Sequence, residues 1–137
     1  MGIGKDIAVI AGYLRRHRNR YMEAFDLKSL HARYLIEICN ALGICQDELT
    51  QRLGFDKSHV ARQAAFLEEN GFLYRSKGQD KRMLCLYPTE KTLALLPGLQ
   101  QAMEQWEENL IQDLLPEEKA QLEALLAKVR ARAEGGQ

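Results

Sequence analysis

Long polar and cationic side chains between residues 57 and 63 carry the clearest chemistry in this sequence. In chain order they are Lys57, Ser58, His59, Arg62 and Gln63. Side chains of these types form hydrogen bonds with base edges, and lysine and arginine neutralise phosphate charge. Asp56 is a good N-cap, and the apolar residues Val60, Ala64 and Leu67 recur at helical spacing. A helix beginning after Asp56 and closed by Asn70-Gly71 would therefore turn these polar side chains outward.

A second short helix is expected just before this one, from Gln46 to Leu53. Leu49 and Leu53 are four residues apart and face inward, and Gly54 can take the left-handed conformation that ends a helix. Two helices joined by Gly54-Phe55 form a helix-turn-helix. The first turn of the second helix in that motif faces base edges in the major groove. We therefore expect the five polar side chains above to contact DNA.

A charged hairpin is predicted after the two helices. β-prone arms at 73–76 and 83–87 flank a polar turn, 77–82, that contains one glycine and three cations. The hairpin cations expected to contact DNA are Arg75, Lys77, Lys81 and Arg82. Arg82 would enter the minor groove, and Asp80, two residues earlier, would orient its guanidinium.

These motifs, in this order and spacing, give the chain its likeness to a known family. The segments that carry it are Asp56-Lys57-Ser58, Leu67 to Phe72, Asp80-Lys81-Arg82 and Thr89-Glu90-Lys91. The chain resembles the MarR family of winged helix-turn-helix transcription factors over almost its whole length. The resemblance implies a mainly α fold with a small β-hairpin wing, in which a winged helix-turn-helix core is flanked by N- and C-terminal dimerisation helices. It also implies that small phenolic or carboxylic compounds bind near the junction of the two parts and weaken DNA binding.

The sequence departs from the family pattern at four positions. Pro88 stands where leucine is usual, Thr92 where glycine is usual, and Thr50 where alanine is usual. Leu115 stands where a hydroxyl cap usually precedes the last helix. These departures concern local packing and helix starts.

Long amphipathic helices are expected on both sides of the winged-helix lobe, which we define as residues 28–88. Apolar residues at spacings of three and four cover 3–25 and 89–133, and Pro116 begins the last helix. These apolar stripes exceed what one lobe can cover, so residues 1–137 are expected to form a single domain that homodimerises through its terminal helices. A twofold axis would place two reading helices roughly 34–36 Å apart, which suits a palindromic operator. The tail from Ala133 to Gln137 is expected to fray.

The first helix also carries a basic run that has two interpretations. It is most simply a solvated face; alternatively, part of it lines a cleft for an anionic aromatic ligand. The residues assigned to that cleft are Tyr13, Arg16, His17 and His31. Cys45 has a similar alternative, because a helix start can favour the thiolate of a redox switch. Cys39 and Cys85 are expected to be packing residues.

Composition narrows the class of protein. The net charge is zero, but residues 88–137 hold five Lys or Arg against nine Asp or Glu, so the acidity lies away from the winged-helix lobe. Three cysteines, no signal peptide and no apolar run of about 20 residues indicate a cytoplasmic protein without a membrane partner. Histidine and cysteine spacings suggest no metal site, no cofactor is expected, and the common enzyme motifs are missing.

The function expected from the sequence is that of a homodimeric DNA-binding regulator, most simply a repressor released by a small ligand. The alternative is a winged-helix protein-interaction module that does not read DNA. Salt separates the two, since DNA binding weakens steeply as salt rises. A third interpretation, that the protein is a small enzyme, has no supporting residues.

Overall fold

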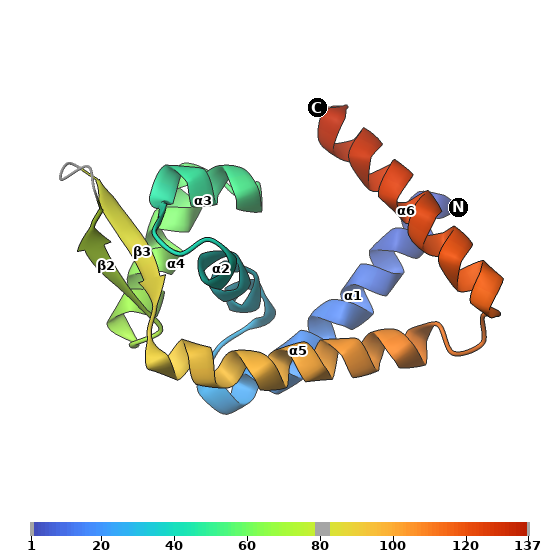
Figure 1. Ribbon diagram of the computed structural model, residues 1–137, viewed down its shortest axis with the longest axis horizontal. Helices are drawn as coiled ribbons and strands as arrows, with labels where there is room; N and C mark the ends of the chain where they lie inside the picture. Colours follow the sequence, from blue (N-terminus) through green and yellow to red (C-terminus); the bar gives the residue numbers. More distant parts are fainter. Residues whose placement is uncertain (1, 79–82, 137) are drawn as a thin grey trace. The chain divides into compact units, whose positions relative to one another are not determined.

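The computed structural model describes residues 2–78 and 83–136. It is mainly helical with one small antiparallel sheet, as the sequence predicts (Figure 1). The helical elements are α1 (Ile3–Met22), a 3-10 turn η1 (Glu23–Phe25), α2 (Ser29–Asn40), α3 (Gln46–Leu53), α4 (Lys57–Glu69), α5 (Glu90–Leu110) and α6 (Pro116–Gly135). The strands are β1 (Ile44–Cys45), β2 (Leu73–Lys77) and β3 (Leu84–Pro88).

The chain forms two compact units. The first, Met1–Met103, contains α1 to α4, the sheet and most of α5. The second, Glu104–Gln137, contains the end of α5 and α6. The boundary lies within α5, whereas the winged-helix lobe and the dimerisation helices proposed from sequence divide the chain by function at residues 88 and 89.

The core of the first unit lies around α2. Tyr34, Leu35 and Ile38 of this helix are fully buried. Leu95 and Leu99 from the first half of α5 join the same core. The remaining buried apolar residues of this core include Met22, Leu49, Leu53, Val60, Leu67, Phe72, Leu73 and Leu86. The inward-facing leucines expected in α3 and the stripe expected in α4 are therefore confirmed.

Local residues fix the bounds of the two helices in the helix-turn-helix. Gly54 ends α3 in the left-handed region at φ 74°, where a side chain would be strained. Asp56 caps α4 by accepting a hydrogen bond from the His59 backbone N–H. Gly71, at φ 80°, turns the chain out of α4 into β2. All three roles are those that the sequence predicts.

The sheet has the order β1-β3-β2 with both pairs antiparallel. β2 and β3 form the arms of the expected hairpin (Figure 1). β2 ends at Lys77 and β3 ends at Pro88, each one residue after the predicted end. Pro88 pairs with Leu73 at the end of β3, and Thr89 N–H donates to the Phe72 carbonyl one position later. Along an antiparallel strand, only every second residue forms backbone hydrogen bonds with a given neighbour. Because Thr89 bonds toward β2, the backbone groups of residue 88 point away from β2, and the missing N–H of Pro88 costs no hydrogen bond to β2.

Hydrogen bonds accommodate the other three departures from the family pattern. Thr50 Oγ1 donates to the Gln46 carbonyl within α3, at 2.8 Å. Thr92 is fully buried, and its Oγ1 donates to the Phe72 carbonyl at 2.5 Å. At the start of α6 the Glu118 carboxylate accepts from the Leu115 N–H at 2.8 Å, which is the glutamate half of a capping box; Leu115 itself makes no side-chain cap bond.

The expectation of a frayed tail is wrong for residues 133–135, and Gln137 lies outside the described residues. Helix α6 continues to Gly135, and Arg130 Nε pairs with the Glu134 carboxylate at 2.7 Å, one turn apart. Ala133 is a strong helix former, and the i,i+4 pair supports the last turn.

Candidate nucleic-acid interface

The first turn of α4 is held in a fixed arrangement by Asp56. Its Oδ1 accepts from the His59 backbone N–H at 2.7 Å and from the Ser58 hydroxyl at 2.8 Å. These two bonds, the backbone one first, lower the pKa of Asp56, so the carboxylate stays charged near neutral pH. The exposed start of α4 is therefore pre-organised.

Two side-chain hydrogen bonds anchor α4 on α2. The hydroxyl of Tyr34, a fully buried residue, lies 2.9 Å from His59 Nδ1, and His31 Nε2 lies 3.0 Å from Gln63 Oε1. Burial raises the pKa of Tyr34 to about 12, so its hydroxyl keeps its proton. Both bonds lie along one side of α4, which fixes its rotation on α2.

The tautomer of His31 follows from its partners. Its Nδ1 accepts from the Lys28 backbone N–H at 2.9 Å, so Nε2 carries the hydrogen and donates to Gln63. Its ring stacks on Phe66 at 5.0 Å. Burial is the main cause that lowers the pKa of His31, which keeps the ring neutral. His31 thus lies between α2 and α4, within the winged-helix lobe.

Three of the side chains expected at DNA form hydrogen bonds or ion pairs within the fold. His59 and Gln63 are half-buried and bonded to α2, as described above. Arg75 Nε pairs with the Glu68 carboxylate and its Nη1 donates to Gln46 Oε1, each at 3.0 Å, with 23% of the side chain exposed. Sequence alone identified these residues as long and polar but could not show that their polar atoms face α2, α3 and α4.

Three other predicted contacts come together on the exposed start of α4. We call Lys57, Ser58 and Arg62 the reading face. Lys57 is 77% exposed and forms an exposed ion pair with Asp47 of α3 at 3.6 Å. Ser58 and Arg62 are one turn apart and exposed, and Arg62 has no hydrogen bond or ion pair with any described residue. This face offers two cations and a hydroxyl to a partner.

Of the two described cations of the wing, Lys77 is exposed at the end of β2, whereas Arg75 is paired with Glu68. Asp80, Lys81 and Arg82 lie outside the described residues.

The four residues expected to line a ligand cleft do not gather at one site. Tyr13 and Arg16 are exposed on α1 and pair with each other, the guanidinium carbon 4.8 Å from the ring centroid. His17 Nε2 lies 3.2 Å from the Ala102 carbonyl of α5. His31 is buried against α4.

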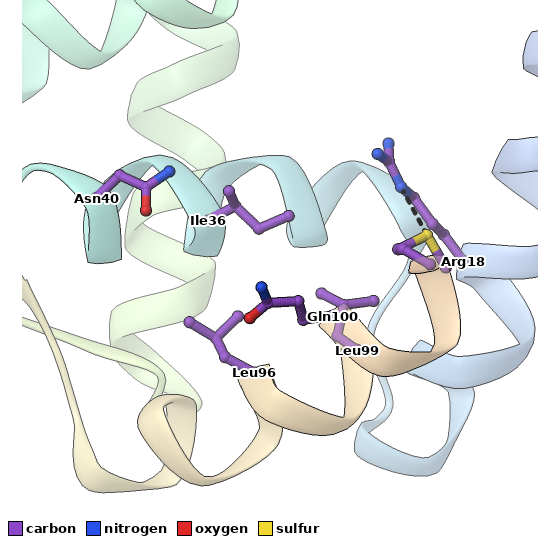
Figure 2. A pocket seen from close by; sticks show the side chains of 7 residues that line it. Arg18, Ile36, Asn40, Leu96, Leu99 and Gln100 are labelled. Atoms are coloured by element: carbon purple, nitrogen blue, oxygen red, sulfur yellow. Dashed lines mark hydrogen bonds between the residues drawn. The ribbon is translucent and has the colours of Figure 1, made fainter. Parts of the chain in front are cut away.

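A cavity of about 340 Å³ lies instead between α1, α2 and α5 (Figure 2). Its lining consists of Arg18, Ile36, Asn40, Leu96, Leu99, Gln100 and Met103. Four of these side chains are apolar, and three bring a guanidinium or an amide. Arg18 belongs to the basic run of α1, from which Arg16 was assigned to the cleft. Its place between Leu14 and the buried Met22, at spacings of four, indicates the inward side of α1.

The cavity is electropositive at Arg18. Arg18 Nε donates to the Met103 thioether at 3.4 Å, a weak acceptor (Figure 2). Burial and then the charge of Arg33 lower the pKa of Arg18. Arg33 lines a smaller adjoining cavity together with Arg18 and Glu37. An arginine stays charged in a protein, so a carboxylate or phenolate entering here would gain a charge-assisted hydrogen bond.

The described residues give no indication of a metal site or of a membrane span. They contain no cluster of three or more His, Cys, Asp or Glu side chains that could hold a metal. None of the described helices has the length and apolar character needed to cross a membrane.

Comparison with known proteins decides the family. Residues 27–84 match the model of the MarR family. The chain is also 31% identical to the HTH-type transcriptional regulator YybA of Bacillus subtilis over 131 residues, which is 95% of this chain and 87% of the relative. The chain belongs to the MarR family. It is thus a DNA-binding transcriptional regulator and not an enzyme.

Solved structures agree with this membership. The MarR-family chain is similar to the transcriptional regulator SlyA, with a TM-score of 0.90, 26% identity and coverage of 99% of this chain and 96% of the other. It is also similar to a MarR-family regulator from Listeria monocytogenes, solved with a 26mer DNA, with a TM-score of 0.86 and 28% identity. That likeness covers 96% of this chain and 89% of the Listeria chain.

Proposed function

We propose that this MarR-family regulator binds a palindromic operator as a homodimer, represses transcription there, and leaves the DNA when a small anionic ligand occupies the cavity between α1, α2 and α5. The observation that carries the proposal is the reading face: exposed cations and a hydroxyl at the start of a helix that is fixed by its cap and by two bonds to α2.

The two cations of the reading face have distinct proposed roles. Arg62 is exposed and long enough to reach a base edge, where a bidentate pair with guanine is the most common specific contact. Lys57, at the first position of α4, is suited to a phosphate. His59 and Gln63 then act as positioning residues, because their bonds to Tyr34 and His31 set the direction of the reading face.

The proposed wing contacts complete the DNA interface. Lys77 extends the positive surface to the end of β2. Arg82, with Lys81 and with Asp80 as its orienting partner, stays a prediction from sequence for a minor-groove contact.

The proposed dimer explains the exposed apolar side chains of the terminal helices. On α1 they include Ile3, which is 74% exposed, together with Ile7, Ile10 and Tyr13 at helical spacing. On α6 they are Leu122, Leu125, Leu126 and Val129, of which Leu125 is 59% exposed. A monomer rarely leaves contiguous apolar surfaces of this kind in water, so a second copy is the simplest cover for both.

The position of the cavity suggests how a bound ligand would relieve repression. Ile36 and Asn40 of α2 line it, and α2 also carries both hydrogen bonds that anchor α4. A carboxylate paired with Arg18 would press on the helix that holds the reading face. Such a ligand loosens DNA binding only if it binds the DNA-free arrangement more tightly.

Salt titration of DNA binding tests the proposal. The dissociation constant for duplex DNA should rise steeply with salt, and Arg62→Ala should weaken binding to the preferred sequence by ~1–3 kcal/mol. Lys57→Ala should weaken all sequences about equally and reduce the salt slope. Arg130→Ala on α6 removes one positive charge elsewhere and serves as the matched control. Wild-type affinity in both reading-face variants would reject this interface, and salt-insensitive binding would favour the protein-interaction alternative.

A further inference from the structure

Two of the three cysteines occupy directly opposite positions on neighbouring strands. Cys45 ends β1 and pairs with Cys85 of β3 in the antiparallel register. We propose that Cys45 and Cys85 form a reversible intrachain disulfide, so that this pair is a thiol oxidation site within the winged-helix lobe.

The backbone ladder shows which kind of pair this is. Thr89 N–H donates to the Phe72 carbonyl of the chain leading into β2, and Gly43 N–H donates to the Leu86 carbonyl. Backbone groups alternate between the two neighbours along a central strand, so residues 85, 87 and 89 bond toward β2 and residue 86 bonds toward β1. The two cysteines therefore form a non-hydrogen-bonded pair between β1 and β3.

The spacing of such a pair suits a disulfide. Directly opposite residues in a non-hydrogen-bonded pair have Cα atoms about 4.5 Å apart and side chains on the same face. Disulfides span Cα separations of about 4.4–6.8 Å. The bond can therefore form without a change of strand register, through side-chain rotation.

The present positions of the thiols leave that rotation open. Both cysteines are half-buried and free. Cys45 is the N-cap of α3 and makes no side-chain cap hydrogen bond there. The Cys85 sulfur lies toward Gly78, where an added Cβ would be only 2.7 Å away. Oxidation would swing this sulfur from the Gly78 side toward β1.

The third cysteine provides an internal contrast. Cys39 lies in α2, outside the sheet register. Burial raises the pKa of the Cys39 thiol, which leaves it less thiolate.

The chemistry balances with a peroxide as oxidant. One thiolate attacks an oxygen of hydrogen peroxide, the O–O bond breaks, and a sulfenic acid forms with release of hydroxide. The second thiolate attacks the sulfenic sulfur, the S–S bond forms, and a second hydroxide leaves. The protons of the two thiols convert both hydroxides to water. A dithiol reductant reverses the bond by exchange.

The consequence for the lobe is a closed covalent ring. It would contain α3, α4 and β2, that is, the helix-turn-helix and one arm of the wing. The thiol state would thus be set within the lobe that carries the reading face. This last step rests on the proposed function, whereas the bond itself does not.

The test oxidises the reduced full-length protein with hydrogen peroxide, in the absence of DNA, and counts thiols before mapping peptides by mass spectrometry. The thiol count should fall from three to one per chain, with a bond between the peptides of Cys45 and Cys85 that dithiothreitol reverses. Cys39→Ser should keep this bond, and Cys45→Ser and Cys85→Ser should each abolish it. Gly78→Ala should speed bond formation, because the added methyl group displaces the Cys85 sulfur from that side.

Three results would overturn the proposal: an unchanged thiol count, a bond that maps to Cys39, or a bond found only between two chains. Because no DNA is present, these results are independent of whether the protein binds an operator.

Discussion

Replacement of Tyr34 by phenylalanine removes one of the two side-chain hydrogen bonds that anchor α4 on α2. The change removes the hydroxyl that lies 2.9 Å from His59 Nδ1 and keeps the ring, which stacks on Phe55 at 6.0 Å. A buried hydrogen bond contributes about 0.5–1.5 kcal/mol net to stability. His59 is half-buried and can partly rehydrate, so the expected loss in the free energy of unfolding is about 1 kcal/mol.

The corresponding shift in Tm can be worked from the chain length. An unfolding entropy of about 2.1 cal/mol/K per residue gives about 0.3 kcal/mol/K for this chain, so a loss of about 1 kcal/mol lowers Tm by about 3 °C. Thermal unfolding should be followed at one fixed protein concentration, since a dimer makes Tm concentration-dependent. Tyr74→Phe is the matched control, because Tyr74 is half exposed on β2, and its Tm should not change.

A double-mutant cycle with His59→Ala tests whether the Tyr34 hydroxyl stabilises the fold through His59. If the hydroxyl acts through His59, the Tyr34→Phe change should cost far less in the His59→Ala background. Equal losses in both backgrounds would show that the hydroxyl and the imidazole act independently. The two single variants should also weaken binding to specific and random DNA alike, which separates an anchor from a base contact.

Three further predictions concern other parts of the molecule. Leu126→Glu places a charge on the exposed apolar stripe of α6 and should shift the mass seen by sedimentation from dimer to monomer; a wild-type mass already equal to one chain would contradict the dimer. The folded-state pKa of His31 lies below its unfolded value of about 6.5. Between these two pKa values the unfolded chain binds more protons than the folded chain, so the free energy of unfolding should fall as the pH drops below about 6.5. That slope should disappear in His31→Gln, and an unchanged slope would mean that another group causes it. Benzoate, as a probe of the cavity, should release wild-type protein from DNA but not Arg18→Met, which keeps the bulk and loses the charge; equal release of both would place the ligand elsewhere.

Helix bounds were the part of the fold that sequence predicted best, because their causes are local. Asp56 caps α4 and Gly54 ends α3 through bonds and backbone angles within a few residues. The tail was expected to fray because it is a terminus, whereas Ala133 and the Arg130–Glu134 pair extend α6 to Gly135.

The site was predictable only in part, since side-chain partners depend on tertiary packing. Lys57 and Arg62 face solvent, as a helical wheel indicates. His59 and Gln63 have the same polarity and lie in the same helix, yet their bonds to α2 involve residues 25 and 32 positions away, which periodicity cannot show. Arg18 belongs to the basic run of α1, but the run alone did not show which of its arginines faces the cavity.

Selection of bound fragments from random duplex DNA by the purified protein tests the central claim most directly. The account predicts enrichment of a twofold-symmetric sequence whose half-sites are centred about one helical turn apart, roughly 34–36 Å, as two reading helices require. Recovery of the input sequences without enrichment would contradict it.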